Sequence, residues 1–129
     1  MNVKKITAVL LVEAVEPCVA FWTERMGFEK TAEVPDEGGK VAFAMLQKGT
    51  AEIMYQTYAS VEKDNPHPDM LARKGPTFLY IEVDDLAATM AAAAGAEAVM
   101  AERTTFYGSK EFGIKDPAGH ILTFAQFGG

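Results

Sequence analysis

The stretch that decides the fold is "GSKEFGIKDPAGHILTFAQF", Gly108–Phe127. Two segments with alternating apolar residues flank the turn sequence Asp116–Gly119, an arrangement typical of a hairpin between two β-strands. The second strand, Ile121–Phe127, carries the polar residue Thr123 among apolar ones. The hairpin therefore raises the question of whether this strand lines a catalytic metal site or a site that only binds.

The first half of the chain predicts a strand, a helix and three further strands. Ile6–Val12 is an apolar, β-rich run, and Pro17 then suits the first turn of a helix, where its missing N–H does no harm. The apolar positions of this helix recur at helical spacing, at Val15, Val19, Trp22 and Met26. Gly27 ends the helix as a left-handed cap. The strands that follow are predicted at Phe28–Val34, Val41–Leu46 and Ala51–Gln56.

The second half predicts the same elements again. Thr77–Val83 is a strand, and Asp84 and Asp85 are both suitable N-caps for an alanine-rich helix, Leu86–Ala94, which Gly95 closes. Further strands are predicted at Glu97–Glu102, Lys110–Lys115 and Ile121–Phe127. The stretch "LLVEAV" at 10–15 also matches "YIEVDDL" at 80–86. The order of elements and the matching residues predict a duplicated βαβββ unit and an α+β fold.

A polar connector separates the two repeats. We expect a single domain over 1–129, with repeat one at 4–56, the connector at 57–76 and repeat two at 77–127. The connector, "TYASVEKDNPHPDMLARKGP", contains three prolines and few apolar residues, so we expect a linker with a short helical turn at Asp69–Arg73. A connection of this length inside a small chain is usually functional or a hinge.

Composition narrows the class of protein. The chain has 129 residues, 49% of them hydrophobic and 23% charged, which is typical of one globular domain. The single cysteine excludes an internal disulfide and a thiolate-rich metal site. The net charge is −6 and no basic cluster is present, which speaks against nucleic acid as a partner. No apolar run is long enough for a membrane span, and the first residues are interpreted as a strand of a cytoplasmic protein rather than a signal peptide.

Three stretches carry a resemblance to a known family. These are "ITAVLLVEAVEPCVAFWTERMGFE" at 6–29, "FLYIEVDDLAATMAAAAGAE" at 78–97 and "EFGIKDPAGHILTF" at 111–124. Together they resemble the openings of the two halves and the closing hairpin of the glyoxalase / bleomycin-resistance / dioxygenase superfamily, the vicinal oxygen chelate fold. The resemblance implies that each βαβββ unit curls into a half-barrel around a cavity.

The resemblance also implies where metal ligands would lie. In metal-dependent members, histidines in the opening strands and glutamates near the ends of the halves hold a divalent ion. The corresponding positions in this chain are Thr7, Phe78 and Thr123, and Glu52 lies within a residue of the remaining one. A catalytic metal needs about three protein ligands, so one carboxylate is not enough. We therefore expect no metal and no cofactor.

An aromatic-lined cavity is the expected site instead. Glu52 and Met54 share one face of their strand, and Phe78 shares a face with Tyr80. Phe106 and Tyr107, in the loop before the closing hairpin, are candidates for a lid. For each of these residues core packing, or for Glu52 a plain surface charge, remains open as the alternative. The residues expected to line the cavity are Thr7, Phe43, Glu52, Met54, Phe78, Tyr80, Phe106, Tyr107 and Thr123.

The remaining reactive side chains have simpler interpretations. His120 lies in the hairpin turn and is expected to face solvent, and His67, between two prolines, is expected to be exposed. Cys18 is interpreted as a small buried residue rather than a nucleophile. Ser60 and Ser109 lack the glycine elbow of a hydrolase.

Three functions remain open at this stage. The leading hypothesis is a homodimeric binding protein of the bleomycin-resistance type, which sequesters an antibiotic or a similar cationic or planar small molecule without catalysis. The second is an enzyme, either a metal-dependent lyase, isomerase or dioxygenase with atypical ligands or a metal-free catalyst. Its candidate ionisable residues are Glu52, Tyr80, Tyr107 and Glu111. The third is an accessory domain whose cavity is filled by its own side chains.

Overall fold

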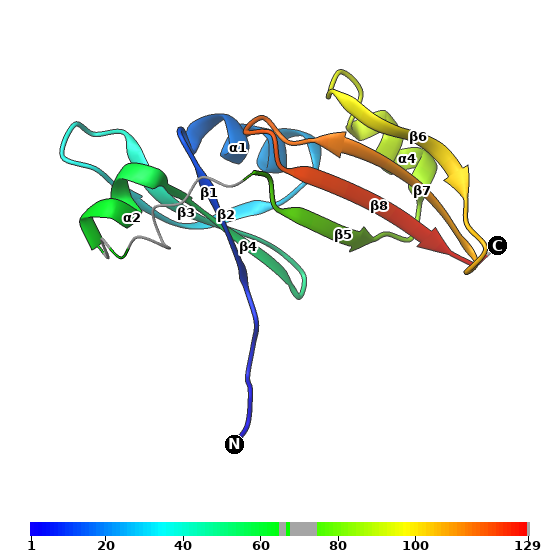
Figure 1. Cartoon of the computed structure of the whole chain (residues 1–129), viewed down its shortest axis with the longest axis horizontal. Helices are drawn as coiled ribbons and strands as arrows, with labels where there is room; N and C mark the ends of the chain where they lie inside the picture. Colours follow the sequence, from blue (N-terminus) through cyan, green and yellow to red (C-terminus); the bar gives the residue numbers. More distant parts are fainter. Residues whose placement is uncertain (65–66, 68–74, 129) are drawn as a thin grey trace. The chain divides into compact units, whose positions relative to one another are not determined.

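The computed structural model describes residues 1–64, 67 and 75–128. The chain divides into two units, Met1–Lys74 (unit 1) and Gly75–Gly129 (unit 2), and each is described by itself. Each unit contains one four-stranded sheet in which the first strand runs parallel to the last one (Figure 1). No helix among the described residues is long and apolar enough to cross a membrane.

The sheet of unit 1 has the strand order β1-β4-β3-β2. These strands are β1 (Ala8–Val12), β2 (Glu29–Pro35), β3 (Val41–Lys48) and β4 (Ala51–Thr57). β1 is parallel to β4, and the other neighbours are antiparallel. The turn between β2 and β3 is closed by Asp36, whose Oδ1 accepts hydrogen bonds from the backbone N–H groups of Gly38 and Lys40.

The first helical segment of unit 1 differs from the single regular helix that was predicted. It consists of α1 (Glu16–Ala20) followed by one turn of π-helix, η1 (Phe21–Arg25). Each π-type hydrogen bond spans one more residue than an α-type bond, which rotates the apolar stripe. The buried side chains are consequently those of Val15, Cys18, Phe21 and Trp22, while Val19 and Met26 are only half-buried. Gly27 ends the segment at φ 72°, as predicted.

The start of the predicted connector is helical. α2 (Tyr58–Asp64) follows β4 directly, and the hydroxyl of Thr57 accepts a hydrogen bond from the backbone N–H of Ser60 at 3.1 Å. Val61 is the buried side chain of this helix. The predicted linker is therefore helical over 58–64, where no helix was predicted from the sequence, because the Thr57 cap and the burial of Val61 stabilise a short helix. The helical turn predicted at Asp69–Arg73 lies outside the described residues.

The sheet of unit 2 repeats the same topology, with the strand order β5-β8-β7-β6. The strands are β5 (Phe78–Glu82), β6 (Ala98–Thr104), β7 (Ser109–Lys115) and β8 (Ile121–Phe127), and the helix is α4 (Leu86–Ala92). Asp85 is the N-cap of α4, and its Oδ1 accepts a hydrogen bond from Ala88 N at 3.0 Å. The strand, helix and three-strand order predicted for each half is confirmed, and so is the α+β class. Whether the two units enclose a cavity stays a prediction.

The closing hairpin forms as predicted, but the environment of His120 does not match the prediction. Asp116 Oδ1 accepts hydrogen bonds from the backbone N–H groups of Ala118 and His120, and Gly119 has φ 93°. His120 is only 5% exposed, and its Nδ1 accepts a hydrogen bond from Thr77 N at 2.8 Å. The expectation that His120 faces solvent was wrong, because this bond joins the turn to the start of β5. His67 is exposed and Cys18 is buried, as predicted.

Candidate functional site

The two faces of the sheet in unit 2 differ in what covers them. Gln126 Oε1 accepts a hydrogen bond from Leu86 N, the first residue of α4, so the β8 side chains in step with Gln126 face the helix. Leu122 and Phe124 lie on this side and are buried. The opposite side is called here the open face of unit 2. Its residues on β5, β7 and β8 include Phe78, Tyr80, Glu82, Ser109, Glu111, Thr123, Ala125 and Phe127.

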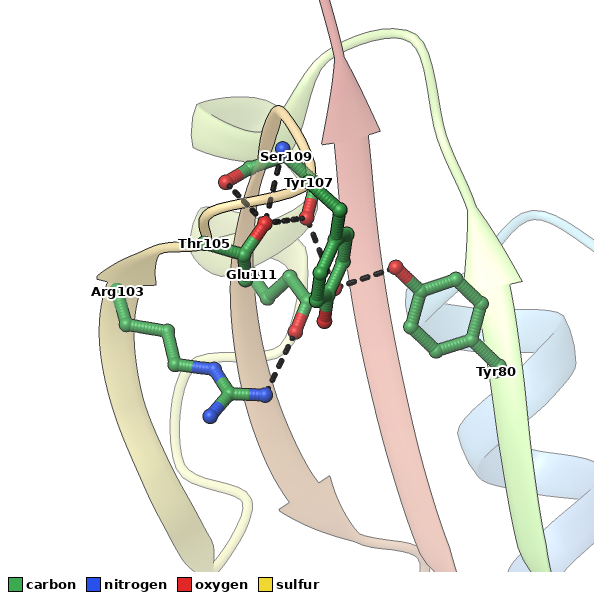
Figure 2. A network of polar contacts seen from close by, with 6 residues as sticks. All are labelled: Tyr80, Arg103, Thr105, Tyr107, Ser109 and Glu111. Atoms are coloured by element: carbon green, nitrogen blue, oxygen red, sulfur yellow. Dashed lines mark hydrogen bonds and ion pairs between the residues drawn. The ribbon is translucent and has the colours of Figure 1, made fainter.

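A buried carboxylate lies at the centre of the open face of unit 2. The Glu111 residue is 0% exposed. Its Oε2 accepts hydrogen bonds from the hydroxyls of Tyr80, Tyr107 (2.8 Å) and Ser109 (2.9 Å). Its Oε1 accepts a hydrogen bond from Arg103 Nη2 at 3.0 Å. Figure 2 shows Arg103 and Tyr80 approaching this carboxylate from opposite sides. We call these five residues, with Thr105, the Glu111 network.

The hairpin between β6 and β7 brings most of the Glu111 network together. The register of these strands pairs Arg103 with Glu111. In the turn, the Thr105 hydroxyl accepts a hydrogen bond from Ser109 N at 3.0 Å, and Gly108 has φ 94°, a conformation that favours glycine. This tight turn directs Tyr107 back toward the sheet, where its hydroxyl reaches Glu111. The sequence "RTTFYGSKE" thus builds the network locally, and only Tyr80 comes from a distant strand.

The charge states within the network follow from these bonds. Burial raises the pKa of Glu111, but the hydrogen bonds from Tyr80, Tyr107, Ser109 and Arg103 outweigh it and lower the pKa to about 2. The hydrogen bond that Tyr80 donates to Glu111, together with burial, raises the pKa of the Tyr80 phenol to about 12. At neutral pH the carboxylate is therefore ionised and the Tyr80 phenol is neutral.

This arrangement is poorly suited to acid–base catalysis. A general base works best with a pKa near the operating pH and within reach of the substrate proton. Glu111 instead has a pKa of about 2, and both of its oxygens already accept hydrogen bonds from the protein. What the network can do is hold two aromatic rings by their hydroxyls. Tyr80 and Tyr107 remain 54% and 46% exposed although their hydroxyls are bound.

The exposed surface around the Glu111 network is aromatic. Phe78, on the same side of β5 as Tyr80, is 73% exposed, and Phe127 at the end of β8 is 43% exposed. The rings of Tyr107 and Phe127 lie 6.4 Å apart between centroids. Phe106, one of the two predicted lid residues, is fully exposed and meets the Tyr107 ring edge-on at 5.1 Å. Adjoining exposed aromatic side chains are a common feature of interaction surfaces.

Unit 1 carries its own carboxylate on the side of the sheet opposite to Tyr55, called here the open face of unit 1. Tyr55 accepts a hydrogen bond from Trp22 Nε1 at 2.9 Å, so it faces the helical segment, and the alternating Glu52 and Met54 face away from it. Glu52 accepts a hydrogen bond from the Thr7 hydroxyl at 3.0 Å and forms an ion pair with Lys5 at 2.9 Å. These two groups lower the pKa of Glu52. Its side chain is 7% exposed, so it is not a plain surface charge.

The predicted site residues thus fall into two groups, one in each unit. Thr7, Phe43, Glu52 and Met54 lie on the open face of unit 1. Phe78, Tyr80 and Thr123 lie on the open face of unit 2, beside Tyr107 of the turn.

Sequence reasoning missed two polar members of the network and undervalued others. Arg103 and Thr105 were not singled out, Ser109 was considered only as a hydrolase nucleophile, and Glu111 appeared only among the residues of the enzymatic alternative. The signal for Arg103 was present in the sequence. An arginine and a glutamate flank the turn in "RTTFYGSKE", and a five-residue connection, Thr105–Ser109, places Arg103 opposite Glu111, which is the pairing observed.

The donor set of the family's metal position does not fit a metal in this chain. Of the four positions, Thr7, Phe78 and Thr123 supply no carboxylate or imidazole, and the Glu52 carboxylate is already bound to Lys5. Across residues 1–64, 67 and 75–128, no group of three or more histidine, cysteine, aspartate or glutamate side chains is placed to hold a metal ion. Divalent transition ions need imidazole, thiolate or carboxylate ligands in such number.

Fold and site together define a class of protein, a duplicated βαβββ chain with a polar–aromatic face, and comparison with known proteins identifies the family. The model of the Glyoxalase/Bleomycin resistance protein/Dioxygenase superfamily matches residues 6–124, so the chain belongs to this superfamily. A search of curated proteins finds no match.

Solved structures share the fold at low sequence identity. TioX from Micromonospora sp. ML1 is 18% identical with a TM-score of 0.74, and the match covers 97% of this chain and 99% of that chain. Lactoylglutathione lyase from Agrobacterium tumefaciens is 16% identical with a TM-score of 0.74, covering 98% and 95% of the two chains. A glyoxalase/bleomycin resistance protein/dioxygenase from Nocardioides is 14% identical with a TM-score of 0.72, covering 98% and 87%. At these identities the likeness concerns the fold alone.

Proposed function

We propose that this chain is a small-molecule-binding protein that sequesters a planar ligand, such as an antibiotic, against aromatic side chains without making or breaking a bond. The observation that carries the proposal is the Glu111 network. Its buried carboxylate is saturated by protein donors, and it holds the rings of Tyr80 and Tyr107 at the surface.

The energetics of the network favour binding over catalysis. A carboxylate that accepts hydrogen bonds from four side chains is a fixed structural anion, and it leaves the phenol of Tyr80 neutral. Rings that are fixed before a ligand arrives lose little conformational freedom on binding, which improves affinity. Each aromatic side chain that a planar ligand covers contributes in proportion to the apolar area removed from water, at about 25 cal/mol per Å².

The shape of the ligand is better supported than its charge. The sequence suggested a cationic or planar molecule. Glu52 and Glu111 both have a cationic partner within the protein, Lys5 and Arg103 respectively. Neither carboxylate therefore needs a positive group from a ligand. The exposed aromatic rings favour a planar ligand, which can stack against them.

The proposal includes a homodimer, as the resemblance to the bleomycin-resistance branch implies, and a cytoplasmic location, as the interpretation of the first residues as a strand suggests. Size-exclusion chromatography with light scattering measures the mass directly. A monomeric mass at micromolar concentration would remove the dimer from the proposal and leave ligand binding to be tested separately.

A metal-dependent enzyme is the alternative, because the superfamily whose model matches residues 6–124 is described by glyoxalase and dioxygenase as well as by bleomycin resistance protein. The side chains at the four family positions oppose it. Metal content after purification in zinc, nickel or iron separates the two functions, since a stoichiometric metal would contradict the binding proposal.

A thermal-shift screen tests the proposed function. The purified protein is heated with planar aromatic drugs, bleomycin-like glycopeptides and divalent metals in parallel. A ligand at a hundredfold over its Kd adds about 2.7 kcal/mol to the free energy of unfolding and raises Tm by several degrees. We expect a shift with a planar ligand, lost in Tyr80→Leu but kept in the control Tyr58→Leu, since Tyr58 lies on α2 in unit 1. A shift with metals alone would refute the proposal.

A further inference from the structure

Arg103 is the charged residue of the Glu111 network that the proposed function does not use. It lies on β6, and its side chain is 54% exposed although it forms an ion pair with a fully buried carboxylate. Nη2 donates a hydrogen bond to Glu111 Oε1 at 3.0 Å. Arg103 is thus held on one side by the protein and open to solvent on the other.

A guanidinium that is oriented by an ion pair and exposed on its other side is well placed to bind an anion. It carries several N–H donors in a rigid planar fork, and one contact to Glu111 leaves others directed elsewhere. Because the ion pair already fixes the side chain, binding a second acceptor costs little further conformational entropy. The guanidinium group is itself planar, which suits a flat ligand with a polar edge.

We propose that Arg103 anchors a carboxylate substituent of the planar ligand while the ring system of the ligand lies against Tyr80 and Tyr107. The ligand class is therefore a planar aromatic acid. This inference rests on the proposed function, because it assigns the chemistry of the ligand that the same open face would take.

Besides Glu111, the open face of unit 2 carries the acidic residue Glu82, which acts in the opposite direction. Glu82 lies on β5 on the same side as Tyr80 and is exposed. Its charge is largely screened by solvent. Arg103, by contrast, is oriented by a carboxylate that is 0% exposed. A charged side chain with a fixed orientation discriminates between ligands more strongly than one screened by solvent. We therefore expect Arg103 to determine which sign of ligand charge is preferred.

Three naphthalene probes of similar size and different charge test the inference by calorimetry on the full chain: 2-naphthoate, 2-naphthamide and 2-naphthylmethylammonium. We expect 2-naphthoate to bind about tenfold to a hundredfold more tightly than the ammonium probe, as for a charge-assisted hydrogen bond. We also expect the preference to shrink as salt is added. Equal affinities for the three probes would overturn the inference and leave the proposed function standing. Absence of binding by all three would overturn both.

Variants separate a direct contact from a change in local charge. Arg103→Gln should weaken 2-naphthoate by about tenfold or more and leave 2-naphthylmethylammonium unchanged or tighter. Lys110→Gln is the matched control, because it removes the same charge from an exposed position one residue from Glu111 on β7. Arg103→Lys should retain part of the preference, since the charge stays but the fork is lost.

A weaker affinity of Arg103→Gln for 2-naphthoate has one competing explanation. Without Arg103, the negative charge of Glu111 is no longer paired and could repel the anion. The double variant Arg103→Gln/Glu111→Gln removes both charges together. If Arg103 is the anchor, the double variant binds 2-naphthoate as weakly as the single one. Recovery of wild-type affinity in the double variant would overturn the inference, as would an equal loss in Lys110→Gln.

Discussion

Each of the two units holds a carboxylate, Glu52 in unit 1 and Glu111 in unit 2, and the two carboxylates are held by different kinds of partners. Both carboxylates lie on the open face of a four-stranded sheet. Glu111 is bound by side chains that come from β5, β6, β7 and the β6–β7 turn. Among the residues that the structure describes, Glu52 is bound by Lys5 and Thr7, which precede β1 in the sequence.

This difference indicates that Glu111 is the carboxylate that is fixed by the fold of its unit. The donors of Glu111 are themselves fixed by strand pairing and by a closed turn, so the network stays assembled as long as unit 2 is folded. The donors of Glu52 belong to the segment before β1, in which Lys5 is 59% exposed. Each unit thus carries an acidic group on its open face, on the last strand (β4) in unit 1 and on the third strand (β7) in unit 2, and the described residues surround only Glu111 with aromatic hydroxyls.

The largest effect that we predict comes from removing the Glu111 carboxylate. Glu111→Ala leaves the hydroxyls of Tyr107 and Ser109 and the guanidinium of Arg103 without their acceptor. We expect a loss of about 3 kcal/mol in the free energy of unfolding, measured by urea denaturation and circular dichroism. Glu52→Ala is the matched variant in unit 1 and should cost clearly less. Equal losses would mean that the two carboxylates are structurally equivalent.

The pH dependence of stability sharpens the same comparison. The folded pKa of Glu111 is about 2, below the value of about 4.3 for an unfolded glutamate. A lowered pKa stabilises the folded state above the unfolded value, and this stability is lost as pH falls from about 4.3 through about 2. Urea midpoints should therefore decline over this range in the wild type and decline less steeply in Glu111→Gln. A parallel decline in both would remove Glu111 as the cause.

At alkaline pH the sign is reversed and Tyr80 is the relevant group. The folded pKa of Tyr80 is about 12, above the value of about 10 for an unfolded tyrosine. Its stabilising contribution is fully present below about pH 10 and is lost as pH rises toward about 12. Tyr80→Phe should flatten this part of the stability curve, measured as urea midpoints against pH. An unchanged slope in Tyr80→Phe would show that the bond to Glu111 is weak in solution.

The smallest effect is predicted for the exposed partner of Glu52. Lys5→Gln should change the free energy of unfolding by no more than about 0.5 kcal/mol, because ion pairs that reach into solvent contribute little. Urea denaturation at low and high salt measures it. A loss comparable with that of Glu111→Ala would show that the segment before β1 is an essential part of unit 1.

Local patterns in the sequence predicted most of the strands. The predicted Ile121–Phe127 strand coincides with β8, and the other strands were placed to within one or two residues. The helical segment was harder, because counting apolar positions assumes α-helical spacing and the π-turn at Phe21–Arg25 breaks that spacing. α2 was missed because its sequence is polar and only one of its side chains, Val61, is buried.

The candidate site was only partly predictable, for a physical reason. Strand alternation places Tyr80 on one face, and hairpin register pairs Arg103 with Glu111, so both could be derived from local sequence. The hydrogen bond from Tyr80 to Glu111 joins residues that are 31 positions apart, and it depends on how β5 is placed beside β8. The burial of His120 has the same origin, since its partner Thr77 is 43 positions away.

The central claim is that Glu111 is a saturated, permanently ionised carboxylate that positions aromatic rings and takes no part in proton transfer. A carboxyl ¹³C NMR titration of the full chain, with the Glu111 resonance assigned by its loss in Glu111→Gln, tests this most directly. The account predicts that this resonance does not titrate between about pH 8 and pH 4, in keeping with a pKa of about 2. A titration midpoint above about pH 5 would contradict it and would mark Glu111 as a group able to exchange a proton with a substrate.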